Sequence, residues 1–215
     1  MASILKFDKV EKLTKKAIPY ETFFGEMNID DLETARRIYL ARQIENVLKD
    51  IFAQMINDAE NGNEIDETYY EHLFGDAYRN IMNEYFDDFS IEDDEKSDEL
   101  SLYMALLILG DVQKHLDDAY WFSDDRAMFV AENEANRIAN VTLDEIAIAD
   151  GYTHKTWVSM GDQNVRQTHR DVDGTTLPIA EPFVVGDSLM MYPLDTSLDA
   201  SAEEIVNCRC TVEYI

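Results

Sequence analysis

The chain has 215 residues, of which 46% are apolar, and 45 acidic residues against 18 basic ones give it a formal net charge of −27. This size and composition predict a folded protein with one or two hydrophobic cores, and no apolar run approaches the roughly 18–20 residues of a membrane span. The charge argues against binding along nucleic acid, whose phosphates would be repelled. Because lysines interrupt the N-terminal apolar residues, we expect no secretory signal and a protein made in a cytoplasm.

Residues 1–28 are predicted to be a basic N-terminal arm. Within the first twenty residues five lysines outnumber two acidic residues: Lys6, Lys9, Lys12, Lys15 and Lys16. Such a cluster is commonly a solvated face. The alternative is that the arm binds an acidic surface of a partner protein.

Residues 29–150 are predicted to form a helical domain. Apolar residues recur at spacings of three and four over 29–58 and 66–86, and the sequence "NGN" at Asn61–Asn63 ends the first of these helices. An acidic loop leads to a third helix over 98–122, whose apolar run "LSLYMALLIL" indicates the central helix of a bundle. The segment 124–150 is predicted to hold one or two helices, since the capping-box pattern of Thr142–Glu145 suggests a break.

The sequence changes character at Gly151. Three of the four prolines and four of the eight glycines lie in 151–215, among the short strand-like runs "TWVSM", "PFVVG", "LMMY" and "CTVEYI". A second capping-box pattern, Ser201–Glu204, predicts a short helix before Asn207. The predicted fold class is therefore α+β, with a mainly helical N-terminal domain and a small C-terminal α+β module over 151–215.

Residues able to carry chemistry gather in this module, and three interpretations are open. In a structural interpretation Asp162 caps a short helix and pairs with Arg166, while His169 bonds a loop carbonyl. Cys208 and Cys210, the two cysteines of the chain, then point inward from a strand, with Arg209 pointing outward. A disulfide between them is disfavoured, because residues i and i+2 of a strand have Cα atoms about 6.5–7 Å apart.

The other two interpretations are chemical. Zinc prefers thiolate and imidazole ligands, which His169, Cys208 and Cys210 would supply, with His154 as a weaker candidate for a fourth ligand. Alternatively, a cysteine with His169 could form a thiol–imidazole pair. Asp171 and Asp173 could also act as acid and base, and either arrangement would make the chain a metal- or thiol-dependent hydrolase.

Taken together, the motifs of the module resemble the phage Mu F-like head-morphogenesis (minor head protein) family of tailed bacteriophages. The resemblance rests on "KTWVSMGDQNVRQTHRDVDGTTLPIAEPF" and "YPLDTSLDASAEEIVNCRCTV", and on the upstream "RAMFVAENEANRIAN", in which Asn133 stands where threonine is more usual. The matching positions in the module are Trp157, Asp162, Arg166, His169, Asp173, Gly174, Phe183, Pro193, Asp195 and Asn207 to Cys210.

The resemblance implies a minor capsid protein of a tailed phage or prophage that is not an enzyme. Such a protein associates with the portal protein at the portal vertex, and with scaffold or major capsid protein, during head assembly or early DNA delivery. Its expected location is the virion or procapsid, assembled in the host cytoplasm, with no cofactor unless the cysteine pair binds zinc. Some relatives carry a toxin domain after the module, which we do not expect here. A bacterial adaptor unrelated to phage is a further alternative.

Overall fold

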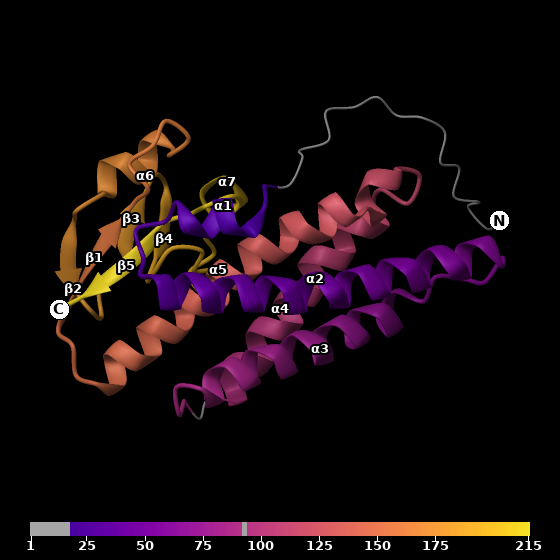
Figure 1. Cartoon of the computed structure of the whole chain (residues 1–215), viewed down its shortest axis with the longest axis horizontal. Helices are drawn as coiled ribbons and strands as arrows, with labels where there is room; N and C mark the ends of the chain where they lie inside the picture. Colours follow the sequence, from indigo (N-terminus) through magenta and orange to yellow (C-terminus); the bar gives the residue numbers. More distant parts are fainter. Residues whose placement is uncertain (1–17, 92–93) are drawn as a thin grey trace. The chain divides into compact units, whose positions relative to one another are not determined.

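The computed structural model describes residues 18–91 and 94–215, so the lysines of the predicted basic arm lie outside the described residues. Within this part the helices and strands follow the predicted α+β order (Figure 1). The helices are α1 (Tyr20–Gly25), α2 (Asp31–Glu60), α3 (Glu67–Asp87), α4 (Asp94–Gln113), the 3-10 helix η1 (Ala119–Phe122), α5 (Asp124–Ala149), α6 (Gln167–Val172) and α7 (Ala202–Ile205). The strands are β1 (His154–Val158), β2 (Thr176–Pro178), β3 (Phe183–Val185), β4 (Ser188–Met190) and β5 (Thr211–Tyr214).

The contacts divide the chain into two compact units. One contains residues 40–131, and the other joins residues 19–39 to residues 132–215. The contacts therefore group α1, the start of α2 and most of α5 with the C-terminal strands. The domain boundaries suggested by composition, at 28/29 and 150/151, stay a prediction.

The unit of residues 40–131 is helical. Asp66 begins α3 by accepting a hydrogen bond from the Tyr69 backbone N–H at 3.1 Å. Helices α3 and α4 pack closely, because a Cβ placed at Gly75 would lie 3.6 Å from the Cβ of Ala105. Along α2, the ring of Phe52 meets the ring of Phe122 edge-to-face, with centroids 6.0 Å apart.

The structure corrects two expectations about α4. The helix spans Asp94–Gln113 rather than 98–122, and the 3-10 helix η1 follows as a separate element. The helix is also not enclosed on all sides: one face is buried (Met104, Ala105, Ile108, Leu109), whereas the other is exposed by 44–56% (Leu102, Tyr103, Leu106, Leu107). The apolar composition of the run is therefore shared between a core face and a solvent face.

Helix α5 runs from Asp124 to Ala149 without the break suggested by the capping-box pattern. The hydroxyl of Thr142 donates to the carbonyl of Ile138, one turn earlier, at 2.7 Å. Thr142 thus bonds within the helix instead of capping a new one. The capping-box pattern at Ser201 does begin a helix, as predicted. Ser201 is the N-cap residue of α7, although its side chain makes no capping hydrogen bond.

The C-terminal strands form a three-stranded antiparallel sheet and a hairpin. The sheet has the order β2-β1-β5, with Trp157 opposite Val212 and Thr156 opposite Thr176, and the hairpin pairs β3 with β4 (Figure 1). Strand β2 was not predicted, since its three residues are too few to show an alternation. Among the described residues, no helix has the length and apolar character to cross a membrane.

Candidate functional site

A buried cluster in the C-terminal unit brings together five of the predicted site residues. Trp157 of β1 lies edge-on to the ring of His169 of α6 at a centroid distance of 5.5 Å, and to the ring of Phe183 of β3 at 5.3 Å. Cys208 and Cys210 approach the same imidazole. The side chains of His169 and both cysteines are buried, with 1–2% of each residue exposed.

The imidazole of His169 divides its two nitrogens between sulfur and carboxylate. Nδ1 lies 3.4 Å from the Sγ of Cys210 and 3.6 Å from the Sγ of Cys208. Nε2 lies 3.1 Å from Oε2 of Glu204, which also accepts a hydrogen bond from the hydroxyl of Thr168 at 2.7 Å. The expected bond from His169 to a loop carbonyl is therefore wrong, because the thiols and Glu204 occupy both ring nitrogens.

Glu204 is the member of this cluster that the sequence did not identify. Its position as the last residue of "SAEE" suggested that it would bond back to the N-terminus of α7. Its carboxylate turns instead to His169 and Thr168. A glutamate three residues before an Asn-Cys-Arg-Cys segment is the signal that could have placed it near the cysteines.

The surroundings shift the pKa values of the two thiols in opposite directions and raise that of the imidazole. A hydrogen bond to Cys208, together with burial, raises the pKa of Cys210, and the nearby indole of Trp157 acts weakly in the opposite direction. Although burial alone would raise it, the pKa of Cys208 is lowered because its sulfur accepts hydrogen bonds from Cys210 and His169. Burial likewise opposes charge on His169, yet the Cys208 sulfur raises the pKa of the imidazole. Cys208 is thus the sulfur that most readily becomes a thiolate.

Asp162 and Arg166 do not form the predicted pair, because α6 begins only at Gln167 and the preceding segment is a turn. The carboxylate of Asp162 accepts the backbone N–H groups of Asn164 at 2.8 Å and Val165 at 3.1 Å, and it pairs with Arg209. Partial burial opposes ionisation, but these hydrogen bonds and the Arg209 charge lower the pKa of Asp162. Arg166 donates to the carbonyl of Val206.

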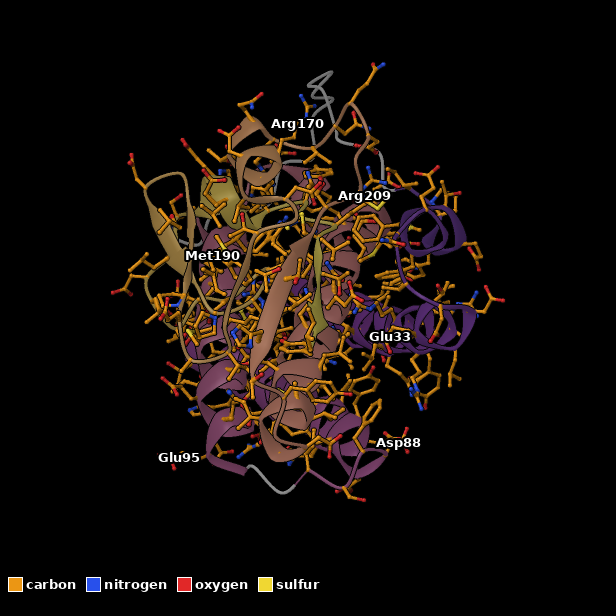
Figure 2. The ribbon with its side chains drawn as sticks, turned by 90° about the vertical axis from the view of Figure 1, so that its left-hand side faces the viewer. Glu33, Asp88, Glu95, Arg170, Met190 and Arg209 are labelled. Atoms are coloured by element: carbon orange, nitrogen blue, oxygen red, sulfur yellow. The ribbon has the colours of Figure 1, made fainter. Side chains whose placement is uncertain are left out.

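Arg209 therefore has a role that the sequence did not suggest. Besides Asp162, it pairs with Glu26 at 3.0 Å and lies 6.0 Å from the centroid of the Phe23 ring of α1. Figure 2 labels Arg209 among the side chains of the chain. Its side chain is 11% exposed, so it does not simply point into solvent as predicted. The residue between the two cysteines thus holds the segment to α1 and to the turn before α6.

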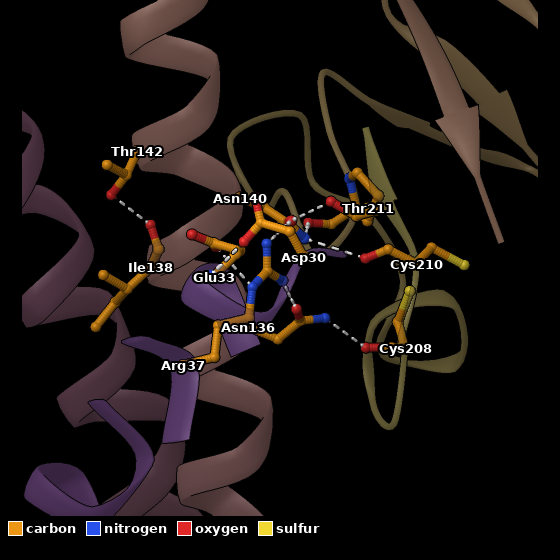
Figure 3. A network of polar contacts seen from close by, with 11 residues as sticks. Asp30, Glu33, Arg37, Asn136, Ile138, Asn140, Thr142, Cys208, Cys210 and Thr211 are labelled. Carbon is orange, nitrogen blue, oxygen red and sulfur yellow. Dashed lines mark hydrogen bonds and ion pairs between the residues drawn. The ribbon is translucent and has the colours of Figure 1, made fainter. Parts of the chain in front are cut away.

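The backbone of the cysteine segment is held by amide side chains of α5 (Figure 3). Asn136 Nδ2 donates to the Cys208 carbonyl at 2.9 Å, and Asn140 Nδ2 to the Cys210 carbonyl at 3.3 Å. Oδ1 of Asn133 accepts the backbone N–H of Asn207 at 2.7 Å. The Asn at position 133, which departs from the more usual threonine, therefore serves the turn at Asn207, whose φ is 61°.

Arg37 of α2 completes this network and was not identified from the sequence. It is fully buried, bonds Glu33 through Nε at 2.8 Å, and donates to the side-chain oxygens of Asn136 and Asn140. The signal available was a stripe of polar residues on α5 at spacings of three and four, positions 133, 136 and 140. Such a stripe on a mostly buried helix needs internal hydrogen-bond partners.

The remaining motif residues make turns or lie apart from the cluster. Asp173 accepts the Ser159 N–H at 2.7 Å beside Gly174, whose φ is 72°, and the buried Asp195 accepts the backbone N–H groups of Met191 and Ser197, each at 2.8 Å. Asp171 is exposed and accepts a bond from Gln167, and His154 is exposed beside Thr153. The structure therefore does not assemble Asp171 with Asp173 as an acid–base pair or bring His154 to the cysteines.

Two buried charged groups were also missed by sequence reasoning. Lys155 of β1 is fully buried with no hydrogen-bond partner for Nζ among the described residues, and burial lowers its pKa. Glu132 of α5 is buried with Oε2 unbonded in the described part of the chain, and burial raises its pKa to about 8. Among the described residues, neither side chain forms a hydrogen bond with His169, Cys208 or Cys210.

A surface pocket of about 520 Å³ lies near the cluster, lined by residues of α6, β2 and β3. Its wall includes Thr168, which bonds Glu204, and Gly186, where a Cβ would lie 2.7 Å from Oε1 of Glu204. The carboxylate that orients His169 therefore lies behind the pocket wall.

The sequence of this chain is similar to a known protein family and to proteins of two bacteria. Residues 109–213 match the model of the family described as "Phage Mu protein F like protein". The uncharacterized protein YqbB of Bacillus subtilis is 30% identical over 112 residues, which cover 50% of this chain and 36% of YqbB. The NAD(+)–arginine ADP-ribosyltransferase EFV of Enterococcus faecalis is 26% identical over 114 residues, covering 46% of this chain and 22% of that protein. No solved structure matches the chain.

Proposed function

Because residues 109–213 match the family model described as "Phage Mu protein F like protein", we propose that this chain is a non-enzymatic minor head protein of a tailed phage or prophage. It associates with the portal protein at the portal vertex, and with scaffold or major capsid protein, and it acts in head assembly or early DNA delivery. The family match carries the proposal, since it supports a role in phage head morphogenesis and takes in the whole cysteine segment and the α5 helix that holds it.

The burial of the thiol–imidazole cluster supports a non-enzymatic role. A hydrolase that used His169 with Cys208 or Cys210 would need its substrate to touch side chains of residues that are only 1–2% exposed. The ADP-ribosyltransferase activity in the name of the Enterococcus relative belongs to a protein of which the match covers 22%. We therefore do not carry that activity over to this chain.

The exposed face of α4 is our proposed partner surface. Leu102, Tyr103, Leu106 and Leu107 recur at the spacing of one helix face and are 44–56% exposed. Apolar side chains gathered on one exposed face mark protein-interaction sites. The basic arm, whose lysines lie outside the described residues, is a second proposed contact, because its charge is opposite to that of the chain as a whole.

The net charge of −27 suits a protein of the head interior. Packaged DNA fills that space, and an acidic surface is repelled by phosphate rather than held by it. In this proposal the protein binds proteins of the virion or procapsid and makes no specific contact with nucleic acid. Measurable binding to DNA at low salt, at sub-micromolar protein, would count against it.

Co-expression with the portal protein from the same phage genome tests the proposal. We expect the two proteins to purify together and Leu106→Gln with Leu107→Gln to weaken the complex at least ten-fold. The matched control is Val184→Gln with Leu189→Gln, which removes exposed apolar side chains from the β3–β4 hairpin instead. If the α4 variant co-purifies with the portal protein as well as the unmodified chain does, the proposed partner surface is rejected. If the unmodified chain does not bind the portal protein, the portal association is rejected.

A further inference from the structure

The arrangement of His169, Cys208 and Cys210 points to a metal site, and we propose that these three side chains bind one Zn²⁺ ion. The candidate ligand atoms, Nδ1 and the two Sγ atoms, all lie within 4.8 Å of one another. Thiolate and imidazole are the ligands that zinc prefers in proteins. The proposal concerns the stability of the module and does not depend on the head function.

The distances between the ligand atoms fit a tetrahedral zinc ion. Bonds of about 2.3 Å to sulfur and about 2.05 Å to nitrogen at the tetrahedral angle place the nitrogen about 3.5 Å from each sulfur. The observed separations of Nδ1 from the two Sγ atoms are 3.4 and 3.6 Å. The described residues supply three ligands, and a solvent molecule would complete the tetrahedron.

The groups behind the ligands are also those of a metal site. A zinc-bound histidine usually gives its other ring N–H to a carboxylate, which fixes the ring and strengthens it as a ligand. His169 meets this condition through Nε2, which lies 3.1 Å from Oε2 of Glu204, and the hydroxyl of Thr168 donates to the same oxygen at 2.7 Å. Nδ1 is thereby left to face the two sulfurs.

The indole of Trp157 supplies an independent observation. The residue is fully buried, and its Nε1–H has no hydrogen-bond partner of good geometry among the described residues, although the Cys210 sulfur is close enough to receive a weak bond from the indole. Such an orphaned donor costs free energy unless an acceptor is close. The indole adjoins Cys210, and a metal-bound thiolate at Cys210 would be a far better acceptor than a neutral thiol.

The ion would link elements that the chain otherwise joins through hydrogen bonds. His169 belongs to α6, whereas the cysteines follow α7 and precede β5. Because the ligands are buried, binding of the ion would contribute to the folding free energy.

The test is the metal content of the full chain, purified under reducing conditions after expression with added zinc. We expect about one zinc ion per chain and the same content in the matched control His154→Gln, which removes an exposed histidine. His169→Gln, Cys208→Ser and Cys210→Ser should each lower the content at least five-fold. Glu204→Gln keeps all three ligands and should weaken zinc binding about 10–100-fold.

Two measurements on the unmodified chain keep the proposal falsifiable if a ligand variant does not fold. Cobalt substitution should give the intense near-ultraviolet charge-transfer band of thiolate ligands, and a strong chelator should lower Tm until zinc is restored. Folded, reduced protein that takes up no zinc, shows no such band and has the same Tm with and without chelator would overturn the site. So would undiminished zinc in the cysteine variants.

Discussion

The side-chain amide of Asn136 donates to the backbone carbonyl of Cys208 at 2.9 Å, across 72 residues of sequence. The oxygen of the same amide accepts from the buried guanidinium of Arg37, so one asparagine satisfies groups from two distant segments. The cysteine segment is therefore positioned by its backbone as well as by its thiols. Side chains of helix α5 hold residues 207–211 in place through hydrogen bonds.

Replacing Asn136 with alanine should destabilise the protein by about 2–4 kcal/mol, because it leaves a buried carbonyl and a buried Arg37 N–H without partners. Urea unfolding followed by circular dichroism measures the change. The matched control is Asn80→Ala on the exposed face of α3, which should alter the free energy of unfolding by less than about 0.5 kcal/mol. Equal effects of the two variants would show that the network contributes nothing to stability.

Glu132 should make the protein less stable as the pH rises. Its folded pKa of about 8 lies above its ordinary value of 4.5, so the folded state holds an extra proton between these values. Stability then falls through that window by roughly 1.4 kcal/mol per pH unit. Glu132→Gln should remove this dependence and be more stable than wild type at pH 8. The free energy of unfolding, measured at pH 5 and pH 8, tests this, with the exposed Glu99→Gln as the control. The same change in unfolding free energy with pH for wild type and Glu132→Gln would contradict it.

Lys155 should behave in the opposite sense. Burial lowers the pKa of its amine, so the unfolded state binds the proton more readily, and stability is lost as the pH falls below the ordinary pKa of lysine. Lys155→Met should stabilise the protein at pH 7 by about 1–3 kcal/mol, and this gain should shrink toward pH 10. Thermal unfolding measures both quantities beside the exposed Lys114→Met. A loss of stability at pH 7 would show that the amine is needed where it lies.

Gly186→Ala should disturb Glu204. The φ of Gly186 is 60°, and an added Cβ would meet Oε1 of Glu204 at 2.7 Å, pushing a carboxylate that His169 and Thr168 hold. Gly161→Ala is the matched control, because Gly161 has a φ of 67° but open space around it. Both variants carry the backbone strain of about 1 kcal/mol; only Gly186→Ala should cost more and also weaken zinc binding. Equal losses would assign the whole effect to the backbone.

The helices could be predicted from the sequence where one face alone is apolar. The segments 29–58 and 66–86 correspond to Asp31–Glu60 and Glu67–Asp87, because spacings of three and four specify a single buried stripe. The same spacing could not predict the buried face of the run "LSLYMALLIL", because the run is apolar on both faces. The packing of α3 against the side of α4 that holds Ala105, which the run itself does not specify, helps to determine which face is covered.

Most members of the site could be predicted from the sequence, but the bonds between them could not. Trp157, His169 and the two cysteines do come together, whereas the pairing of Asp162 with Arg166 assumed a helix across both residues, and α6 begins only at Gln167. Arg209 replaces Arg166 as the partner, from 47 residues away. Local spacing carries no information about such distant competitors, which is also why Arg37 and Glu204 were missed.

The last strand determines when the module can fold. Strand β5 pairs with β1, and the Ile215 carbonyl accepts the N–H groups of Thr153 and His154. The side-chain amides of α5 donate to carbonyls that lie more than 50 residues later in the sequence. During synthesis these donors and the central strand emerge first, and their bonds to Cys208, Cys210 and β5 form only after those residues have left the ribosome. Contacts of such long sequence separation also close slowly. The nascent module therefore passes through an interval in which β1 has an open edge, when a chaperone or an assembly partner could capture it.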